Sequence, residues 1–341
     1  MAQKLLEVRN LTTGFMTEKG FVKATDRISI NIEKGQTLCL VGESGSGKSV
    51  TSLSIMRLID YAGGTILDGK IEFKGDDLAA KKQDQMKNIR GNKIAMIFQD
   101  PMSALNPVFT VGEQIAESLR LHQNKSGDEA WKEAIDLLKL VGIPAAEMRA
   151  KQYPHEMSGG MCQRVVIAIA LACKPELLIA DEPTTALDVT IQAQILELLM
   201  RLKEELGMAI LLITHDMGVA AEVADHIAVM YAGAIVEQGT VEEIFTNPSH
   251  PYTIGLLKSI PGFEGGSSEK ELYTIKGTIP GLGNLPQGCR FNPRCPHVMD
   301  KCRQVEPGDF KIGNEHTTKC WLFEDKPEVT VSGGTGGNTN V

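Results

Sequence analysis

The sequence has no long hydrophobic run and no excess of positive charge. Its longest apolar stretch, VVIAIALAC, runs only from Val165 to Cys173, whereas a helix that crosses a bilayer needs about 20 apolar residues. The opening residues MAQKLLEVRN contain no apolar core of signal-peptide length. The net charge of −8 argues against general binding to nucleic acid. We therefore expect a globular protein that exerts any role at a membrane through a partner.

Closely spaced cysteine pairs are also absent from the sequence. None of the seven cysteines is followed by another at the C-x2-4-C spacing that structural zinc sites usually show. Cys39 lies in an apolar strand-like run, and Cys162 and Cys173 lie in an apolar helix-like run. We expect these three thiols to be packed in the core. The other four are gathered near the C-terminus, at Cys289, Cys295, Cys302 and Cys320.

The sequence does contain a phosphate-binding loop between a strand and a helix. The apolar run Leu38 to Val41 precedes it, and the helix-like stretch Ser49 to Leu58 follows it. Glycines let successive backbone N–H groups surround phosphate oxygens, and the helix N-terminus adds its positive end. Lys48 is expected to reach the β- and γ-phosphates, and the Ser49 hydroxyl to ligate Mg²⁺. The predicted ATP-binding residues of this loop are Gly42, Glu43, Ser44, Gly45, Ser46, Gly47, Lys48, Ser49 and Val50.

Three further apolar runs end in polar residues that suit a nucleotide site. They finish at Gln99, at Asp181-Glu182 and at Thr214-His215. Ligands of a parallel sheet bind outside the carboxyl ends of its strands. We therefore predict Asp181 as a Mg²⁺ partner and Glu182 as the base that orients the attacking water. His215 is placed to touch the γ-phosphate and that water.

The residue pattern that predicts secondary structure changes twice along the chain. Strand-like alternation dominates the beginning, whereas the middle is more helical, with Trp131, Ile135, Leu138 and Val141 at helical spacing. Beyond about Pro251 the chain consists largely of Gly/Pro-rich loops, and no internal repeat is present. The predicted organisation is a nucleotide-binding domain over 1–250 with a helical subdomain at about 100–165, an extension over 251–330, and a flexible tail over 331–341.

The stretch HEMSGGMCQRVVIAIALACKPELLIADEPTTALD, followed by LLITHD, resembles the nucleotide-binding subunits of ATP-binding-cassette (ABC) transporters. The resemblance covers about residues 5–250, with the motifs in order and at the right spacings. One signature residue differs, because Met161 stands where the family usually has Gln. The resemblance implies an α/β P-loop NTPase, with a RecA-like core, an antiparallel β subdomain and a helical subdomain, that hydrolyses ATP.

In that family two subunits sandwich two ATP molecules. The resemblance implies that Ser158, Gly159 and Gly160 contact the partner subunit's ATP, and that Asp188 lies at the dimer interface. It also implies that Gln99 contacts ATP and assists Ser49 and Asp181 at Mg²⁺. Gln99 and the DPMSALNP segment after it are implied to sense the transmembrane subunits. An aromatic residue near the N-terminus stacks on adenine. Phe15 is our preferred candidate, with Phe21 as the alternative.

The C-terminal third, with NPSHPYTIGLLKSIP and GCRFNPRCP, resembles the ATPase subunits of peptide importers, dipeptide importers above all. The implied partners are a second, paralogous ATPase subunit, two transmembrane permeases and an extracytoplasmic substrate-binding protein. The implied location is the cytoplasmic face of the inner plasma membrane, as a peripheral subunit. The substrate stays open among dipeptides, oligopeptides, haem and nickel. The rival hypothesis is a soluble cassette ATPase that acts on nucleic acid or ribosomes, which the single phosphate loop and the acidic charge disfavour.

The four C-terminal cysteines admit three interpretations. Disulfides are rare in the reducing cytosol, where clustered cysteines suggest a metal. Four thiolates on long, Pro-bearing loops could hold a [4Fe–4S] cluster, and the family resemblance favours this hypothesis. Zinc, with His297 or His316 as a substitute ligand, is the second possibility, and unligated thiols are the third. A cluster could be a structural staple or a redox or iron sensor.

Overall fold

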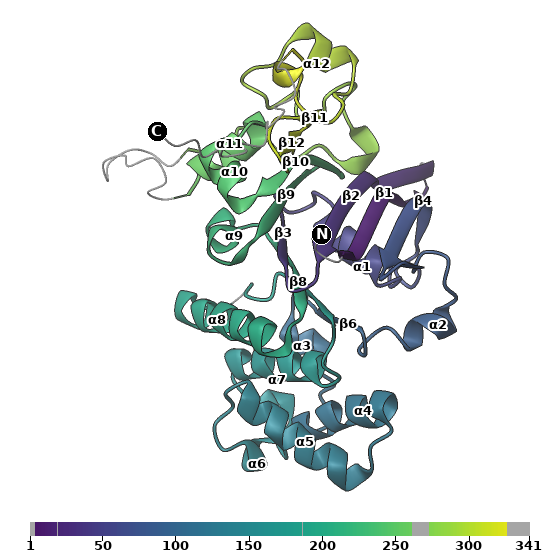
Figure 1. Ribbon diagram of the computed structural model, residues 1–341, viewed down its shortest axis with the longest axis vertical. Coiled ribbons are helices and arrows are strands. Elements are labelled where there is room, and N and C mark those ends of the chain that lie inside the picture. The colour runs from purple at the N-terminus through teal and green to yellow at the C-terminus, as the bar shows by residue number, and fades with distance from the viewer. Residues whose placement is uncertain (1–3, 19, 186, 261–272, 326–341) are drawn as a thin grey trace, which may run out of the picture.

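The structure is a computed structural model that describes residues 4–18, 20–185, 187–260 and 273–325 of the chain. The predicted tail over 331–341 lies outside the described residues, as does most of the Gly/Ser-rich stretch before residue 273. Figure 1 shows a central sheet with a smaller sheet beside it, a helical lobe at one end, and the C-terminal segment at the other end.

An eight-stranded sheet forms the centre, in the order β11-β12-β10-β9-β3-β8-β7-β6. The neighbours from β9 to β6 are parallel, whereas β10, β12 and β11 pair in antiparallel fashion. The strands are β3 (Thr37–Val41), β6 (Ile94–Ile97), β7 (Leu177–Asp181), β8 (Ala209–Thr214), β9 (His226–Tyr231), β10 (Ala234–Thr240), β11 (Phe310–Lys311) and β12 (Thr317–Thr318). The prediction that four apolar runs form parallel strands of one sheet is confirmed, since β3, β8, β7 and β6 are neighbours.

Burial explains why these strands read as continuous apolar runs. Every residue of β3, β7 and β8 is buried, because helices cover one face of the parallel part of the sheet and the smaller sheet covers most of the other. Helix α8 connects β7 to β8, and α9 connects β8 to β9. The helices around the sheet are α1 (Lys48–Ile55), α8 (Val189–Leu206), α9 (Met217–Val223) and α10 (Val241–Thr246).

A four-stranded antiparallel sheet packs beside the central one, in the order β2-β1-β4-β5. Its strands are β1 (Lys4–Thr17), β2 (Gly20–Glu33), β4 (Gly64–Phe73) and β5 (Asp76–Asp77), and the short helix α2 (Gln83–Lys87) follows them. Inward side chains such as Leu6, Val8 and Ile28 share one hydrophobic cluster with Leu40 of β3 and Ile213 of β8. This packing fixes β1 and β2 next to the strand that enters the phosphate loop.

The helical lobe lies between β6 and β7 in the chain. The helix predicted around Trp131 is confirmed as α5, which begins with a capping box formed by Ser126 and Glu129. The apolar run that is too short to cross a bilayer lies mostly in α7, whose residues from Val165 to Ala168 are buried. The elements of this lobe are α3 (Pro101–Ala104), α4 (Val111–Gln123), α5 (Gly127–Leu140), α6 (Ala146–Arg149), the 3-10 turn η1 (Pro154–Glu156) and α7 (Gly159–Leu171).

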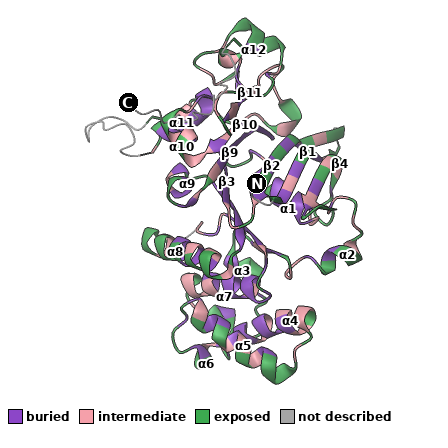
Figure 2. Cartoon of the chain, in the orientation of Figure 1, coloured by how far each residue is buried: buried purple, intermediate pink, exposed green. Residues whose placement is uncertain are grey.

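The C-terminal segment is attached to the central sheet. β12 pairs with β10 through Glu237 and Thr318, and the rings of Tyr231, Tyr252 and Phe291 pack together with centroids 4.7 to 5.5 Å apart. Figure 2 shows the central strands mostly buried and the region around α12 more exposed. The remaining elements are α11 (Pro251–Lys258), α12 (Asp300–Gln304), and the 3-10 turns η2 (Leu282–Asn284) and η3 (Trp321–Phe323). In the part of the chain that is described, no helix is long and apolar enough to span a membrane.

Candidate nucleotide site

The phosphate loop joins the buried end of β3 to the first turn of α1. Gly47 stands at the helix start with φ of 105°, a conformation that favours glycine. At Gly42 the limit is space, because an added Cβ would lie 2.1 Å from the carbonyl oxygen of Met230. The loop is also tied to the neighbouring chain, since the Gly233 N–H donates to the Ser46 carbonyl at 2.8 Å. These constraints fix the glycine-rich turn at the carboxyl end of the parallel strands.

The carboxyl ends of β6, β7 and β8 bring the predicted polar residues to this loop. The Ser49 hydroxyl donates to Asp181 Oδ1 at 3.2 Å. Gln99 Nε2 donates to Glu182 Oε2 at 3.0 Å, and His215 Nδ1 lies 3.4 Å from the same oxygen. The structure therefore gathers Ser49, Asp181, Gln99, Glu182 and His215 in one place, as their positions at strand ends predicted.

Lys48 lies at the centre of this group. Its side chain is only 4% exposed, and Nζ lies 3.8 Å from Glu182 Oε1. Nζ also donates to the carbonyl oxygens of Gly42 at 2.7 Å and Glu43 at 3.1 Å. Burial lowers the pKa of Lys48, while the carboxylates of Glu182 and Asp181 oppose that shift. A buried ammonium bonded to loop carbonyls is a ready donor for an anionic ligand such as a phosphate.

The two acidic residues after β7 differ in their surroundings. Asp181 is 6% exposed, and burial raises its pKa, against the hydrogen bond from Ser49. Glu182 adopts φ of 47°, a strained conformation for a residue with a Cβ. Its N–H donates to the Ile213 carbonyl at 2.9 Å, and its Oε2 also accepts from Thr185 Oγ1 at 3.0 Å. These contacts aim the Glu182 carboxylate into the site.

An open cavity of about 630 Å³ lies over the loop, a size suited to a nucleotide-like ligand. It is polar at the phosphate-loop end, and one apolar side chain, Leu282, comes from the C-terminal segment. The lining residues are Glu43, Ser44, Gly45, Gly47, Lys48, Ser49, Val50, Gln99, Glu182, His215 and Leu282.

Some predicted site residues lie outside this cavity. Among the described residues that line it, neither Phe15 nor Phe21 appears; Phe15 is paired with Val22 across β1 and β2, so adenine stacking stays a prediction. Ser158 caps α7, accepting from the Met161 N–H. Ser158, Gly159 and Gly160 are likewise outside the described cavity lining.

Asp188 is exposed at the N-terminus of α8, where its side chain accepts from the Ile191 N–H at 3.0 Å. Gly160, from the signature segment, lies against the Ile191 side chain. The starts of α7 and α8 are thus neighbours. The roles predicted for Asp188 and the signature residues toward a partner subunit remain predictions.

Sequence reasoning missed three contributors to the site. Leu282 lines the cavity. The Tyr252 hydroxyl accepts the Glu43 N–H at 2.9 Å, and Arg294 binds the Glu43 carboxylate through two nitrogens, at 2.6 and 2.9 Å. They are separated from Glu43 by more than 200 residues in sequence, and no local motif marks such a contact.

The cysteines fall into the two predicted groups. Cys39, Cys162 and Cys173 are buried within the main hydrophobic cluster, which confirms them as packed thiols. The C-terminal thiols are also free of disulfide bonds, like every cysteine in the described chain. Cys302 and Cys320 are buried, and Cys289 and Cys295 are partly buried. Across the described residues, no group of three or more His, Cys, Asp or Glu side chains is arranged to hold a metal ion.

The two histidines considered as substitute zinc ligands lie in different surroundings. His316, one of the two substitute ligands considered, is 1% exposed, and its Nε2 lies 2.7 Å from Glu237 Oε1. The other, His297, is exposed. Glu237 also accepts the backbone N–H groups of Ser249 and His250. His316 is therefore engaged in a buried polar network rather than available as a ligand.

Comparisons with known proteins agree with this geometry. The family model described as ABC transporter matches residues 25–185, and that of the oligopeptide/dipeptide transporter C-terminal region matches residues 236–302. The oligopeptide transport ATP-binding protein AppD of Bacillus subtilis is 53% identical over 322 residues, covering 94% of this chain and 98% of that protein. The dipeptide transport ATP-binding protein DppD of the same organism is 51% identical, covering 97% and 98% respectively.

Solved structures show the same fold. A dimeric, post-hydrolysis structure of the ATP-binding cassette MJ0796 bound to ADP and Pi is 30% identical, with a TM-score of 0.63. It covers 70% of this chain and 99% of that one. The predicted fold class, a P-loop NTPase of the ABC type, is thereby confirmed. The chain therefore belongs to the ABC transporter family of ATPases, among the ATP-binding proteins with an oligopeptide/dipeptide transporter C-terminal region.

Proposed function

We propose that this protein is the ATP-hydrolysing subunit of an importer of dipeptides or oligopeptides. The observation that carries the proposal is the combination of a complete nucleotide site with a C-terminal region of the peptide-transporter type. The similarity to AppD and DppD extends over nearly the whole chain, including that C-terminal region. Haem and nickel are the alternative cargoes in this proposal, because the residues of an ATPase subunit do not contact the cargo.

The site residues divide the work of hydrolysis. The N–H groups of the phosphate loop and Lys48 bind the phosphates of ATP. Glu182, oriented by Gln99 and Thr185, accepts a proton from the attacking water. His215, on the open side of Glu182 with its side chain 60% exposed, contacts the γ-phosphate.

Mg²⁺ fits the pair formed by Ser49 and Asp181. Their oxygens, 3.2 Å apart, are the hydroxyl and carboxylate ligands that Mg²⁺ prefers, and Gln99 adds an amide oxygen from the end of β6. Bound there with ATP, the ion neutralises charge on the phosphates. The chain's own contribution is to hold both oxygens at the mouth of the phosphate loop.

The proposed transporter contains further subunits besides this chain. The starts of α7 and α8 would face a second, paralogous ATPase subunit and its ATP. Ser158, Gly159 and Asp188 are exposed there, and Gly160 is partly exposed. Closure of that ATPase dimer on ATP would turn two permeases outward, and an extracytoplasmic binding protein would deliver the peptide to them. The subunit would then lie on the cytoplasmic face of the inner plasma membrane.

We further propose that Cys289, Cys295, Cys302 and Cys320 hold a [4Fe–4S] cluster. The four thiols are close enough for their charges to interact, and the backbone at Phe291 and Asn292 lowers the pKa of Cys289, against the effect of burial. The backbone at His297 and at Leu322 acts in the same direction on the pKa of Cys295 and of Cys320. Backbone donors aimed at sulfur stabilise thiolates.

Without a cluster, burial opposes thiolate formation at these positions. It raises the pKa of Cys289 to about 11 and that of Cys320 to about 12. A cationic cluster that binds thiolates would remove this cost. Three of the thiols come from irregular segments and the fourth, Cys302, from the short helix α12. The cluster would staple a segment with few regular elements. Its use as a redox or iron sensor is a second possibility that the same assay can examine.

The transport proposal is tested in proteoliposomes that contain the chain, its paralogue and the two permeases. Peptide-loaded binding protein should stimulate ATP hydrolysis and peptide uptake together. Stimulation by nucleic acid or ribosomes, with no uptake and no association with the permeases, would refute the transport proposal.

The cluster proposal is tested by anaerobic purification of the protein, with about four irons and four sulfides per chain expected. Each Cys→Ser change should abolish them, whereas wild-type protein without iron would overturn the cluster hypothesis.

A further inference from the structure

Glu43, the second residue of the phosphate loop, is bound through all three of its polar groups. Its carbonyl oxygen accepts from Lys48 Nζ at 3.1 Å, and its N–H donates to the Tyr252 hydroxyl at 2.9 Å. Its carboxylate accepts two bonds from Arg294, at 2.6 Å and 2.9 Å. Two of these three contacts come from beyond residue 250, outside the strands and helices that form the rest of the site.

Arg294 is itself fixed in a built pocket. Its side chain is 4% exposed, and Nε donates to the Lys276 carbonyl at 3.0 Å. The guanidinium lies over the rings of Tyr231 and Phe291, 5.7 and 6.0 Å from their centroids. A planar, bidentate guanidinium with all sides occupied has one geometry available. The ion pair between Arg294 and Glu43 is therefore held in one geometry, unlike a flexible ion pair at the surface.

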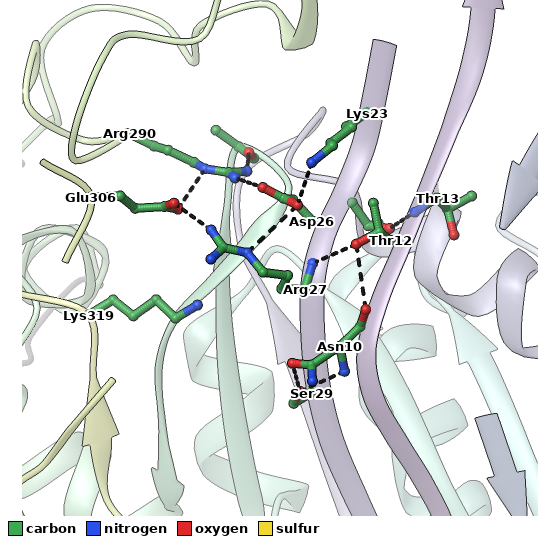
Figure 3. Close-up of polar contacts among 12 residues, drawn as sticks. Asn10, Thr12, Thr13, Lys23, Asp26, Arg27, Ser29, Arg290, Glu306 and Lys319 are labelled. Atoms are coloured by element: carbon green, nitrogen blue, oxygen red, sulfur yellow. Dashed lines mark hydrogen bonds and ion pairs between the residues drawn. The ribbon is translucent and has the colours of Figure 1, made fainter. Parts of the chain in front are cut away.

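The C-terminal segment is anchored separately by a second group of charges, shown in Figure 3. Arg290 binds Asp26 at 2.5 Å, and Glu306 binds Arg27 at 2.5 Å. In addition, Arg290 Nε lies 3.5 Å from Glu306 Oε1, and Arg27 Nε lies 3.8 Å from Asp26 Oδ1. This ring of four charges attaches the segment to β2 without touching Glu43. Docking of the segment and control of the phosphate loop can therefore be perturbed independently.

The same segment also forms a wall of the nucleotide cavity. Leu282 lines it beside the phosphate loop, and Gly283 lies against Val22 of β2. We propose that Arg294 is a positioning residue for ATP: by binding Glu43, it fixes the phosphate loop in the conformation that receives the nucleotide and makes the C-terminal extension part of that site. A loop ordered before the ligand arrives binds it more tightly than one that must be ordered on binding.

The first measurement is the dissociation constant of Mg·ATP for the full chain, alone, in wild type, Arg294→Gln and Arg294→Lys. Both variants should bind at least about five-fold more weakly, the lower end of usual coupling between sites. Lys should not rescue, because a single ammonium cannot reproduce the bidentate contact. In the assembled complex KM for ATP should rise while kcat stays near wild type, since Arg294 does not touch Glu182 or His215.

Two further variants separate positioning from loss of structure. Glu43→Gln breaks the same contact from the loop side and leaves the segment around Cys295 unchanged, so it stays informative if Arg294→Gln fails to fold. The double variant Glu43→Gln/Arg294→Gln should bind no more weakly than the weaker single variant. Glu306→Gln breaks the docking ring and should leave ATP affinity within about two-fold of wild type.

The outcomes are decisive in both directions. Unchanged affinity in Arg294→Gln, additive losses in the double variant, or an equal loss in Glu306→Gln would overturn the inference. The inference rests on the phosphate loop being the ATP site, as proposed above. That proposal would fail separately, if wild-type protein did not bind Mg·ATP or if Lys48→Ala bound it normally.

Discussion

Replacement of Glu182 by Gln isolates the chemistry of hydrolysis from the binding of ATP. Gln has the same size, and its amide oxygen can still accept from Gln99 Nε2 and Thr185 Oγ1, each 3.0 Å from Oε2. The left-handed backbone at φ of 47° is unchanged, because neither residue is branched at Cβ. What is lost is a group that can take a proton from water.

The expected magnitudes follow from these contacts. Removal of a general base costs about 10²–10⁴-fold in kcat, which corresponds to about 3–5 kcal/mol of barrier height. ATP affinity should change less than about five-fold, or under about 1 kcal/mol. Lys48 retains its bonds to the Gly42 and Glu43 carbonyls, and its distance to Glu182 is already 3.8 Å. Affinity and turnover should therefore separate.

The assay compares Mg·ATP binding with phosphate release in the assembled complex. Thr185→Ala is the matched control, since it removes a hydroxyl that contacts the same carboxylate oxygen but leaves the carboxylate in place; its kcat should stay within about ten-fold of wild type. Normal hydrolysis by Glu182→Gln would remove Glu182 from its role. A parallel loss of ATP binding would assign Glu182 to the architecture of the site instead.

Three more predictions concern stability and loop geometry. Glu237→Ala leaves two buried N–H groups without an acceptor and should destabilise the protein by about 3–5 kcal/mol, seen as a melting temperature about 10 °C lower; the exposed Glu242→Ala should change it little. Burial lowers the pKa of His250 from 6.5 to about 4, so the unfolded state takes up the proton first and stability should fall by about 3 kcal/mol between pH 6.5 and 4. His250→Asn, which retains a cap, should flatten that pH dependence in urea titrations, and an unchanged pH profile would show that His250 does not cause it. Gly42→Ala should lose ATP binding by more than about ten-fold, because its Cβ would meet a backbone oxygen at 2.1 Å; binding near wild type would show that the loop can move.

The elements that carry the phosphate chemistry could be predicted from local sequence patterns. One apolar run leading into the phosphate loop and three ending in polar residues predicted four parallel strands whose carboxyl ends meet. The structure places Ser49, Asp181, Gln99, Glu182 and His215 within one group of contacts there. This was predictable because strand ends are local features, and buried parallel strands have a continuous apolar pattern. The helix around Trp131 was predictable for the same reason, through its period and its stop signals.

How the C-terminal extension joins that site could be seen only in the folded protein. Arg294 and Glu43 are 251 positions apart in sequence, and His316 reaches Glu237 across 79. No periodicity or spacing encodes such pairs. They arise because β12 adds to the edge of the sheet at β10 and the Tyr231, Tyr252 and Phe291 rings pack beneath the loop. Packing of the extension onto the sheet thus selects which charges meet, since a buried charge must find its partner wherever the fold places it.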